Sequence, residues 1–180
     1  MENFAAKLTE LQAAKKYQNL VIDLRYNAGG SSSLISPLCG FADAFVKAGG
    51  NFYLLVGEKT FSSGMLAVTS MRQYNPLMIG IPTGGGENHY GNIEKTVELK
   101  NSGIKVSCAT RWIQVLADPI VSSAFPDILV KHTFEDYFNG VDPELEIVKR
   151  LASGELEKPE PKNVELLAVK MADIIDYKVY

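Results

Sequence analysis

The sequence lacks any cluster of basic side chains. Its 18 Lys and Arg residues are scattered among 21 Asp and Glu residues, which gives a formal net charge of -3 over 180 residues. A protein that binds a nucleic-acid backbone or an anionic membrane by charge needs a basic patch, so we expect no nucleic-acid partner. Long apolar runs are missing too. None approaches the roughly 20 residues of a membrane-spanning helix, so we expect no membrane segment.

Cysteine is scarce. Cys39 and Cys108 are the only two, and neither has a second Cys or His at metal-ligand spacing. We expect two buried thiols, with a single disulfide as the alternative, and no metal or organic cofactor. The N-terminus is amphipathic and lacks the charged, apolar and small-residue order of a signal peptide, so the sequence leaves the cellular compartment open.

Hydrophobic residues are plentiful in comparison. They make up 46% of the chain and charged residues make up 22%, enough to bury a core. We expect residues 1–180 to form one globular domain, because the sequence shows no internal repeat and no second domain, and the Pro/Glu-rich link at Glu157–Lys162 leads only to a last helix.

The first half of the chain alternates apolar runs of strand length with segments of helical periodicity. The expected strands are Asn19–Leu24, Asn51–Gly57 and Leu77–Pro82, and the expected helices are one containing Phe4, Leu8 and Leu11, one from about Leu34 to Ala48, and one starting near Ser62 or Ser63. Repeated strand–helix units in a compact domain predict a parallel sheet with right-handed crossovers.

The second half has a different pattern. Apolar and polar residues alternate on both sides of Asn101-Ser102-Gly103, which predicts a β-hairpin. A late strand is expected in "PDILVKH", then a helix from Asp142 to Leu151 and a last helix from Val164 to about Ile175. The predicted fold class is therefore α/β, with a mainly parallel sheet, flanking helices and a β-hairpin.

Two loops follow strands in a way that has chemical meaning. Gly29 and Gly30 offer backbone N–H groups that could stabilise an oxyanion, although Gly-Gly also forms ordinary turns. Ser62 and Ser63 lie where a strand gives way to a helix, so either hydroxyl could be a nucleophile or a helix cap. Loops at the ends of parallel strands share one edge of the sheet, which favours a common site.

Several segments resemble, in order, the tail-specific or C-terminal-processing serine peptidases. They are "VIDLRYNAGG", "TFSSGM", "PTGGGENHYG", "LKNSGIKV" and "PDILVKHTFEDYFNGVDPELE", which together span Asn19 to about Leu151. The resemblance implies a ClpP/crotonase-like core and a peptide or protein substrate. It implies Ser62 as the nucleophile and an oxyanion hole at Gly29, Gly30 and Ser63.

The sequence departs from that family at the general base. Met65 stands where many members have Glu, and the Gly-rich segment "TGGGENHYG" has no Lys, so a Ser/Lys dyad is not expected. Tricorn-like relatives draw a His from a region before the "DLRxNxGG" strand. The resemblance therefore implies that this chain is the C-terminal peptidase part of a longer protein whose base lies upstream.

His89 is the candidate base within the chain, because an imidazole titrates near neutral pH. The alternative is that His89 and Tyr90 shape a substrate loop. Glu87 could orient the imidazole or simply be solvated. A second function therefore stays open, in which the chain is a non-catalytic peptide-binding module or an inactive peptidase relative.

Three other polar residues have structural interpretations. His132 follows a predicted strand and is expected to be structural, and Asp118 precedes a proline and is expected to form a turn. Arg25 is expected to pair with Asp23 or another acid at the strand end.

Overall fold

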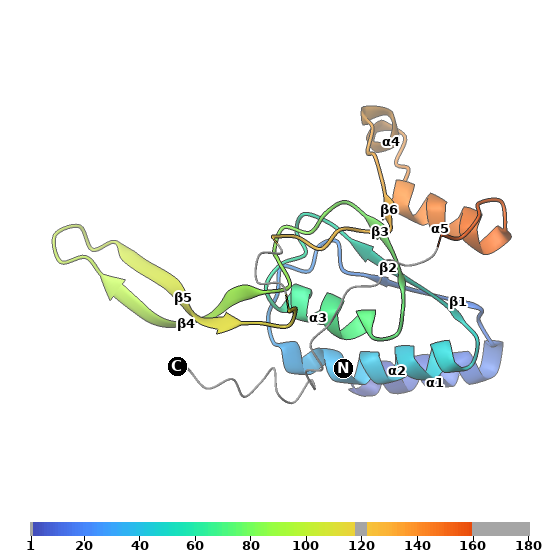
Figure 1. Ribbon diagram of the computed structural model, residues 1–180, viewed down its shortest axis with the longest axis horizontal. Helices are drawn as coiled ribbons and strands as arrows, with labels where there is room; N and C mark the ends of the chain where they lie inside the picture. The colour runs from blue at the N-terminus through green and yellow to red at the C-terminus, as the bar shows by residue number, and fades with distance from the viewer. Residues whose placement is uncertain (1, 118–121, 160–180) are drawn as a thin grey trace.

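The computed structural model describes residues 2–117 and 122–159 (Figure 1). Its centre is a four-stranded sheet in the order β1-β2-β3-β6, with every neighbouring pair parallel. The strands are β1 (Asn19–Asp23), β2 (Asn51–Val56), β3 (Leu77–Gly80) and β6 (Ile128–Leu129). The predicted α/β class with a mainly parallel sheet is confirmed.

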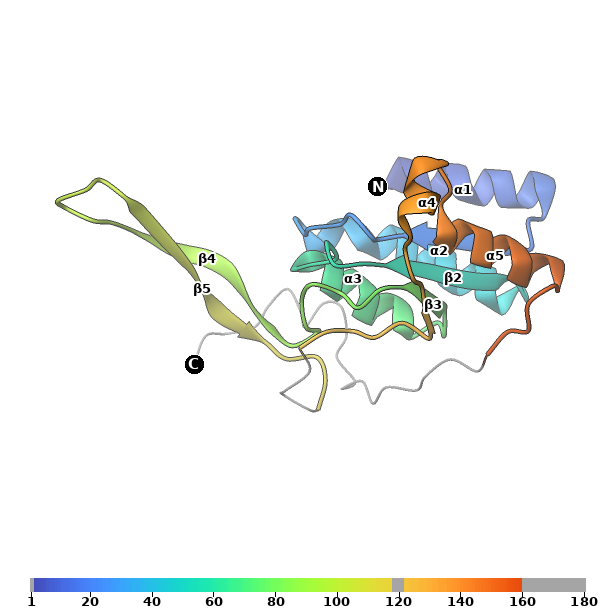
Figure 2. The same cartoon turned by 90° about the horizontal axis from the view of Figure 1, so that it is seen from above.

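Helices cover both faces of this sheet (Figures 1 and 2). They are α1 (Glu2–Lys15), α2 (Ser36–Lys47), α3 (Ser63–Arg72), α4 (Phe134–Phe138) and α5 (Pro143–Ser153), with a short 3-10 helix η1 (Ser32–Ile35) before α2. Helices α2 and α3 lie on one face and α5 on the other, while α1 packs against α2.

Strand β2 shows why the sheet needs cover on both faces. Phe52, Leu54 and Val56 point into the core beneath α2 and α3, whereas Tyr53 and Leu55 point into the core beneath α5. Side chains alternate across a strand, so a continuous apolar run buries both sets only between two layers. The expected strand at Asn51–Gly57 is confirmed as β2.

A second, two-stranded sheet projects from the body as an arm (Figures 1 and 2). Antiparallel strands β4 (His89–Glu98) and β5 (Lys105–Ile113) form it, and Gly103 turns the chain with a φ of 68°. The predicted hairpin at Asn101-Ser102-Gly103 is confirmed. Its far half packs on no layer formed by the described residues, so Val97 and Val106 remain exposed.

Helix α5 begins as the sequence predicted. The Asp142 side chain accepts a hydrogen bond from the Leu145 N–H, which caps the helix. Helix α4 was not predicted, although Thr133 and Asp136 form a reciprocal capping box at its N-terminus, which is a sequence signal for a helix start. The helix expected at 164–175 lies outside the described residues.

The two cysteines differ. Both are free, but Cys39 is buried, which raises its pKa to about 11, whereas Cys108 is exposed. The expectation of two buried thiols is wrong for Cys108 because it lies on the arm, away from the core. No helix in the described part of the chain combines the length and apolar character needed to cross a membrane.

Candidate active site

Ser62 occupies a strained turn between β2 and α3. Its φ of 53° and ψ of -124° fall in a region that residues with a side chain rarely adopt. Such a conformation costs roughly 1–3 kcal/mol and persists only where the surrounding structure enforces it. Here the loop after β1 enforces it. The Phe61 N–H donates to the Asn27 carbonyl over 3.0 Å, and a Cβ on Gly64 would lie 2.4 Å from that same oxygen.

The adjacent serines use their hydroxyls differently. Ser63 Oγ donates to the Gly30 carbonyl over 2.6 Å and so ties α3 to the glycine loop. The half-buried Ser62 side chain precedes the helix, yet it provides no cap, and its hydroxyl makes no hydrogen bond to any residue that the structure describes. Ser62 also lies at the positive end of the α3 dipole, where negative charge is favoured.

The glycine loop approaches Ser62 closely. A Cβ on Gly29 would lie 2.8 Å from Ser62 Cβ and 3.2 Å from its Oγ, so only glycine fits. Gly29 and Gly30 have φ values of 115° and 129°, and the Gly29 N–H donates to Asn27 Oδ1 over 3.0 Å. Among the described residues, nothing accepts a hydrogen bond from the N–H of Gly30 or of Ser63.

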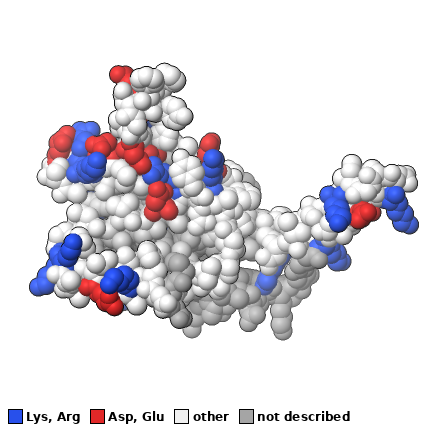
Figure 3. Space-filling model, turned by 180° about the vertical axis from the view of Figure 1, so that it is seen from behind, with Lys and Arg blue, Asp and Glu red and all other residues white. Residues whose placement is uncertain are grey.

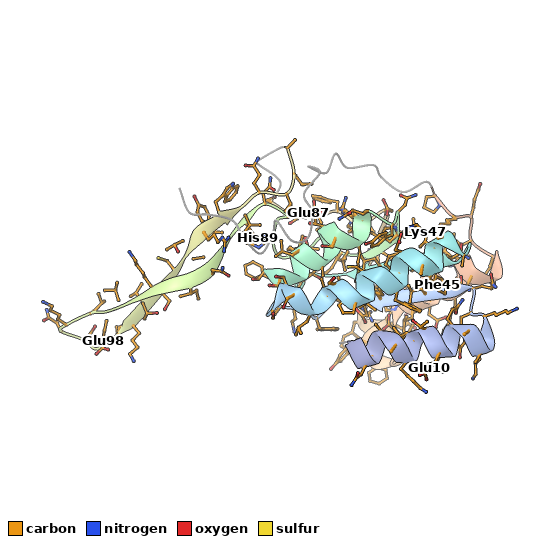
Figure 4. All side chains as sticks on the ribbon, turned by 90° about the horizontal axis from the view of Figure 1, so that it is seen from below. Glu10, Phe45, Lys47, Glu87, His89 and Glu98 are labelled. Carbon is orange, nitrogen blue, oxygen red and sulfur yellow. The ribbon has the colours of Figure 1, made fainter. Side chains whose placement is uncertain are left out.

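A cavity of about 250 Å³ opens beside Ser62. Gly30 and Ser63 line it from the body, and His89 and Arg111 line it from the base of the hairpin. Figure 4 shows His89 where the arm meets the body, far from Glu98 at the other end of the arm. This volume lies below the roughly 300–1,000 Å³ of pockets for drug-sized ligands, so it suits a short piece of an extended chain.

His89 has a defined tautomer. Its Nδ1 lies 3.1 Å from both the Gly86 and Glu87 carbonyl oxygens. Carbonyls only accept, so we assign the proton to Nδ1, which leaves Nε2 with a free lone pair. His89 does not lie within a loop, because it is the first residue of β4. No hydrogen bond joins it to Ser62 in the described chain.

The Glu87 side chain points away from this chemistry. It is 1% exposed, and its Oε1 lies 3.0 Å from Arg72 Nε, at ion-pair distance but without hydrogen-bond alignment. Burial raises the pKa of Glu87, and the nearby Arg72 opposes that rise. The interpretation of Glu87 as solvated is therefore wrong. The contact that orients His89 comes from the Glu87 backbone and not from its carboxylate.

Tyr90 lies on the opposite face of the hairpin from His89. Its ring packs against Trp112 with centroids 4.9 Å apart, and 62% of its surface is exposed. It does not line the cavity. The proposed place of Tyr90 in a substrate loop therefore gains no support from the cavity.

A second polar cluster lies around Arg25, which follows β1. The guanidinium contacts Asp23 at 2.7 Å, Asp142 at 2.8 Å and Glu144 at 3.0 Å, so its predicted pairing with acids is confirmed. Arg25 holds the pKa of Asp142 below its ordinary range. Glu144 is 1% exposed and also lies 2.6 Å from His132 Nε2, which fits the structural role expected for that histidine. Asp118 falls outside the described residues.

Arg111 is the charged residue among the cavity residues that sequence reasoning missed. It lies opposite Gly91 on β5, just as Ile113 lies opposite His89. Counting the hairpin register back from Gly103 would not have placed it beside the histidine, because an irregularity between Ile93 and Lys95 shifts the register by one residue and so exchanges the two faces. As for metals, residues 2–117 and 122–159 contain no group of three His, Cys, Asp or Glu side chains placed to hold an ion.

No protein-family model and no curated protein matches the sequence. Solved structures do resemble the fold. A candidate peptidase from Parabacteroides merdae aligns with a TM-score of 0.57 at 20% identity, covering 82% of this chain and 56% of that one. The tricorn protease aligns with a TM-score of 0.52 at 18% identity, covering 77% of this chain and 15% of that one.

A lipoprotein from Streptococcus agalactiae also shares the fold, with a TM-score of 0.50 at 14% identity over 86% of this chain and 61% of that one. The chain thus spans less than two thirds of each of these three structures. At such identities the likeness establishes a fold found in peptidases, and the site has to be argued from its own geometry.

Proposed function

We propose that the chain is a serine-type peptidase domain with Ser62 as the nucleophile. The observation that carries the proposal is the strained turn, which presents an unbonded Ser62 hydroxyl to a cavity at the N-terminus of α3. Strained serines between a strand and a helix are a recurring way to expose a nucleophile. The substrate would be a peptide or protein in extended form, because the cavity is small.

In the proposed reaction, Ser62 Oγ attacks the carbonyl carbon of the scissile peptide bond. The proton leaves Oγ for His89 Nε2, a C–O bond forms, and the carbonyl oxygen becomes an oxyanion. His89 then donates the proton to the departing amine as the C–N bond breaks. Water, deprotonated in turn by His89, hydrolyses the acyl-enzyme and restores Ser62.

The oxyanion hole is assigned to the N–H groups of Gly30 and Ser63, which make no hydrogen bond within the described chain. Gly29 can contribute as a third donor only by exchanging Asn27 Oδ1, its present acceptor, for the oxyanion. The absence of a side chain on Gly29 lets the loop approach Ser62 in either case.

A fluorophosphonate probe tests the nucleophile. We expect the wild-type chain to be labelled, with the adduct mapped to Ser62 by mass spectrometry, and Ser62→Ala to abolish labelling. Ser153→Ala is the control, because it removes an exposed serine hydroxyl at the C-terminal end of α5, away from the cavity, and should leave Ser62 reactive. Labelling at another residue, or no labelling of a folded wild-type chain, would refute the assignment.

The identity of the base is tested by His89→Ala. If His89 is the base, the labelling rate should fall by roughly 100-fold to 10,000-fold, the usual contribution of general acid–base catalysis. An unchanged rate would move the base to the region upstream that the family resemblance implies. A longer form of the protein that includes this region should then react faster.

The alternative function is peptide binding without cleavage. It is favoured by the missing hydrogen bond between Ser62 and His89, since a serine without a base is a weak nucleophile. Peptide binding by a chain that resists the probe would support it.

A further inference from the structure

Arg111 differs from the other three arginines of the chain. Arg25, Arg72 and Arg150 each lie within 3.0 Å of a carboxylate. The Arg111 side chain makes no ion pair or hydrogen bond with any described residue, although its Nε is buried. The residue as a whole is half-buried. A guanidinium stays charged at every accessible pH, and a charge that is partly removed from water without a partner is unfavourable. The binding of an anion beside Arg111 would therefore be favourable.

The hairpin directs Arg111 toward the reacting serine. In the β4–β5 register, His89 pairs with Ile113 and Gly91 pairs with Arg111, so these four residues share one face. All four line the cavity beside Ser62, whereas Tyr90 and Trp112 pack together on the other face. Among the described residues that line the cavity there is no Asp or Glu, and Arg111 is the one fixed charge.

We propose that Arg111 is a specificity-determining residue that binds a carboxylate of the peptide close to the scissile bond. This inference rests on the proposed function, because it places the peptide beside Ser62. The planar guanidinium offers five N–H donors in a geometry that matches a carboxylate with two parallel hydrogen bonds. The positive end of α3 adds to the same field.

The carboxylate has two sources, which a peptide series can separate. One is an Asp or Glu side chain near the cleaved bond, and the other is the C-terminal carboxylate of a short product or substrate. With about 250 Å³ available, the cavity would admit only a residue or two beside Ser62. Either source must therefore lie close to the reacting carbonyl.

Binding of fluorescein-labelled hexapeptides to the full chain tests the proposal without requiring turnover. The series consists of Ala/Gly peptides with Glu moved through each position, their Gln counterparts, and neutral peptides with a free or an amidated C-terminus. All are measured by fluorescence anisotropy in a Ser62→Ala background. We expect at least one anionic peptide of the series to bind roughly 10-fold to 100-fold tighter than its neutral counterpart, which is the effect of charge-assisted hydrogen bonds.

Arg111→Gln should reduce that preference to less than about 2-fold, and Arg111→Lys should recover part of it. Lys105→Gln is the matched control, because it removes the same charge from the exposed far end of β5 and should leave the preference intact. Equal binding of anionic and neutral peptides by the otherwise unmodified chain would overturn the proposal even if the Arg111 variants fail to fold. A preference that survives in Arg111→Gln would overturn it too.

The outcome is separable from that of the proposed function. A chain that resists the fluorophosphonate probe but prefers anionic peptides through Arg111 would lose the peptidase assignment and keep this one. A chain that is labelled at Ser62 but binds anionic and neutral peptides equally would keep the peptidase assignment and lose the proposal for Arg111.

Discussion

Arg25 and Arg111 carry the same side chain in opposite circumstances. Arg25 is held by three carboxylates, one of them the fully buried Glu144, whereas Arg111 has no partner in the described chain. A folded chain normally pairs the charges that it buries. The Arg25 cluster therefore belongs to the scaffold, and the unpaired Arg111 belongs to a surface that another molecule completes.

A single loop connects the Arg25 cluster with the candidate active site. It leaves β1 at Arg25, inside the paired cluster, and within five residues reaches Gly30, whose N–H has no acceptor in the described chain. Between them Asn27 fixes the turn that holds Ser62. On the face in Figure 3, blue and red atoms are interspersed over the end of the body away from the arm, without a broad field of one sign there. What distinguishes the scaffold from the site is whether each charged or polar group has a partner, and not the net charge of the surface.

The largest expected effect comes from breaking the paired side. Arg25→Gln leaves Glu144 buried with His132 as its remaining partner, and it also releases Asp23 and Asp142. Removing one member of a buried ion pair costs about 3–5 kcal/mol, because the other charge stays desolvated. Urea unfolding followed by far-UV circular dichroism at pH 7 should show a loss of that size.

Lys149→Gln provides the control, since it breaks an exposed pair with Glu146 on helix α5. It should change the unfolding free energy by less than about 0.5 kcal/mol. A similarly small change for Arg25→Gln would mean that the Arg25 cluster does not stabilise the fold, and Arg25 would then no longer differ from Arg111 in this respect.

The scaffold was the more predictable half from sequence. Apolar runs such as Asn51–Gly57 indicate a doubly covered strand whatever the rest of the chain does, and Asp142 before a proline indicates a helix start. The hairpin followed from alternation around Gly103. Its projection as an arm did not follow, because alternation shows which residues share a face but not whether a layer covers that face.

The site was less predictable because its decisive features are not local. The residue types of Ser62, Gly29 and His89 pointed to one edge of the sheet. The strained turn at Ser62 is held by Asn27, which lies 35 positions earlier, and the buried Glu87 lies beside Arg72. Arg111 could not be placed by counting register from the turn, because an irregularity between Ile93 and Lys95 shifts the register by one residue. Contacts across such separations depend on tertiary packing, which a periodicity does not encode.

A substitution with an expected effect of intermediate size tests how the loop after β1 supports the position of Ser62. Gly29→Ala places a methyl group 2.8 Å from Ser62 Cβ at a φ of 115°. The backbone strain should cost about 1–3 kcal/mol, and the displaced turn should slow fluorophosphonate labelling of Ser62 by at least about 10-fold. Thermal unfolding and labelling rates measure the two effects.

Gly49→Ala separates strain from position. Gly49 has a φ of 87°, but an added methyl group would meet nothing within 4 Å, so stability should fall while labelling stays as in the wild type. If both variants slowed labelling equally, general loosening of the fold would explain the loss, and the close contact of Gly29 with Ser62 would have no special part.

The smallest expected effect is on the unpaired side. Arg111→Gln is the same substitution as Arg25→Gln, yet it separates no ion pair within residues 2–117 and 122–159 and relieves a buried, unbonded Nε. The cost of desolvating that charge offsets what its packing contributes, so the unfolding free energy should stay within about 0.5 kcal/mol of the wild type. The same urea titration measures it. A loss above about 2 kcal/mol would show that the guanidinium supports the hairpin base, and Arg111 would then join Arg25 as part of the scaffold. Near-neutral stability together with lost preference for anionic peptides is the combination that only a binding residue predicts.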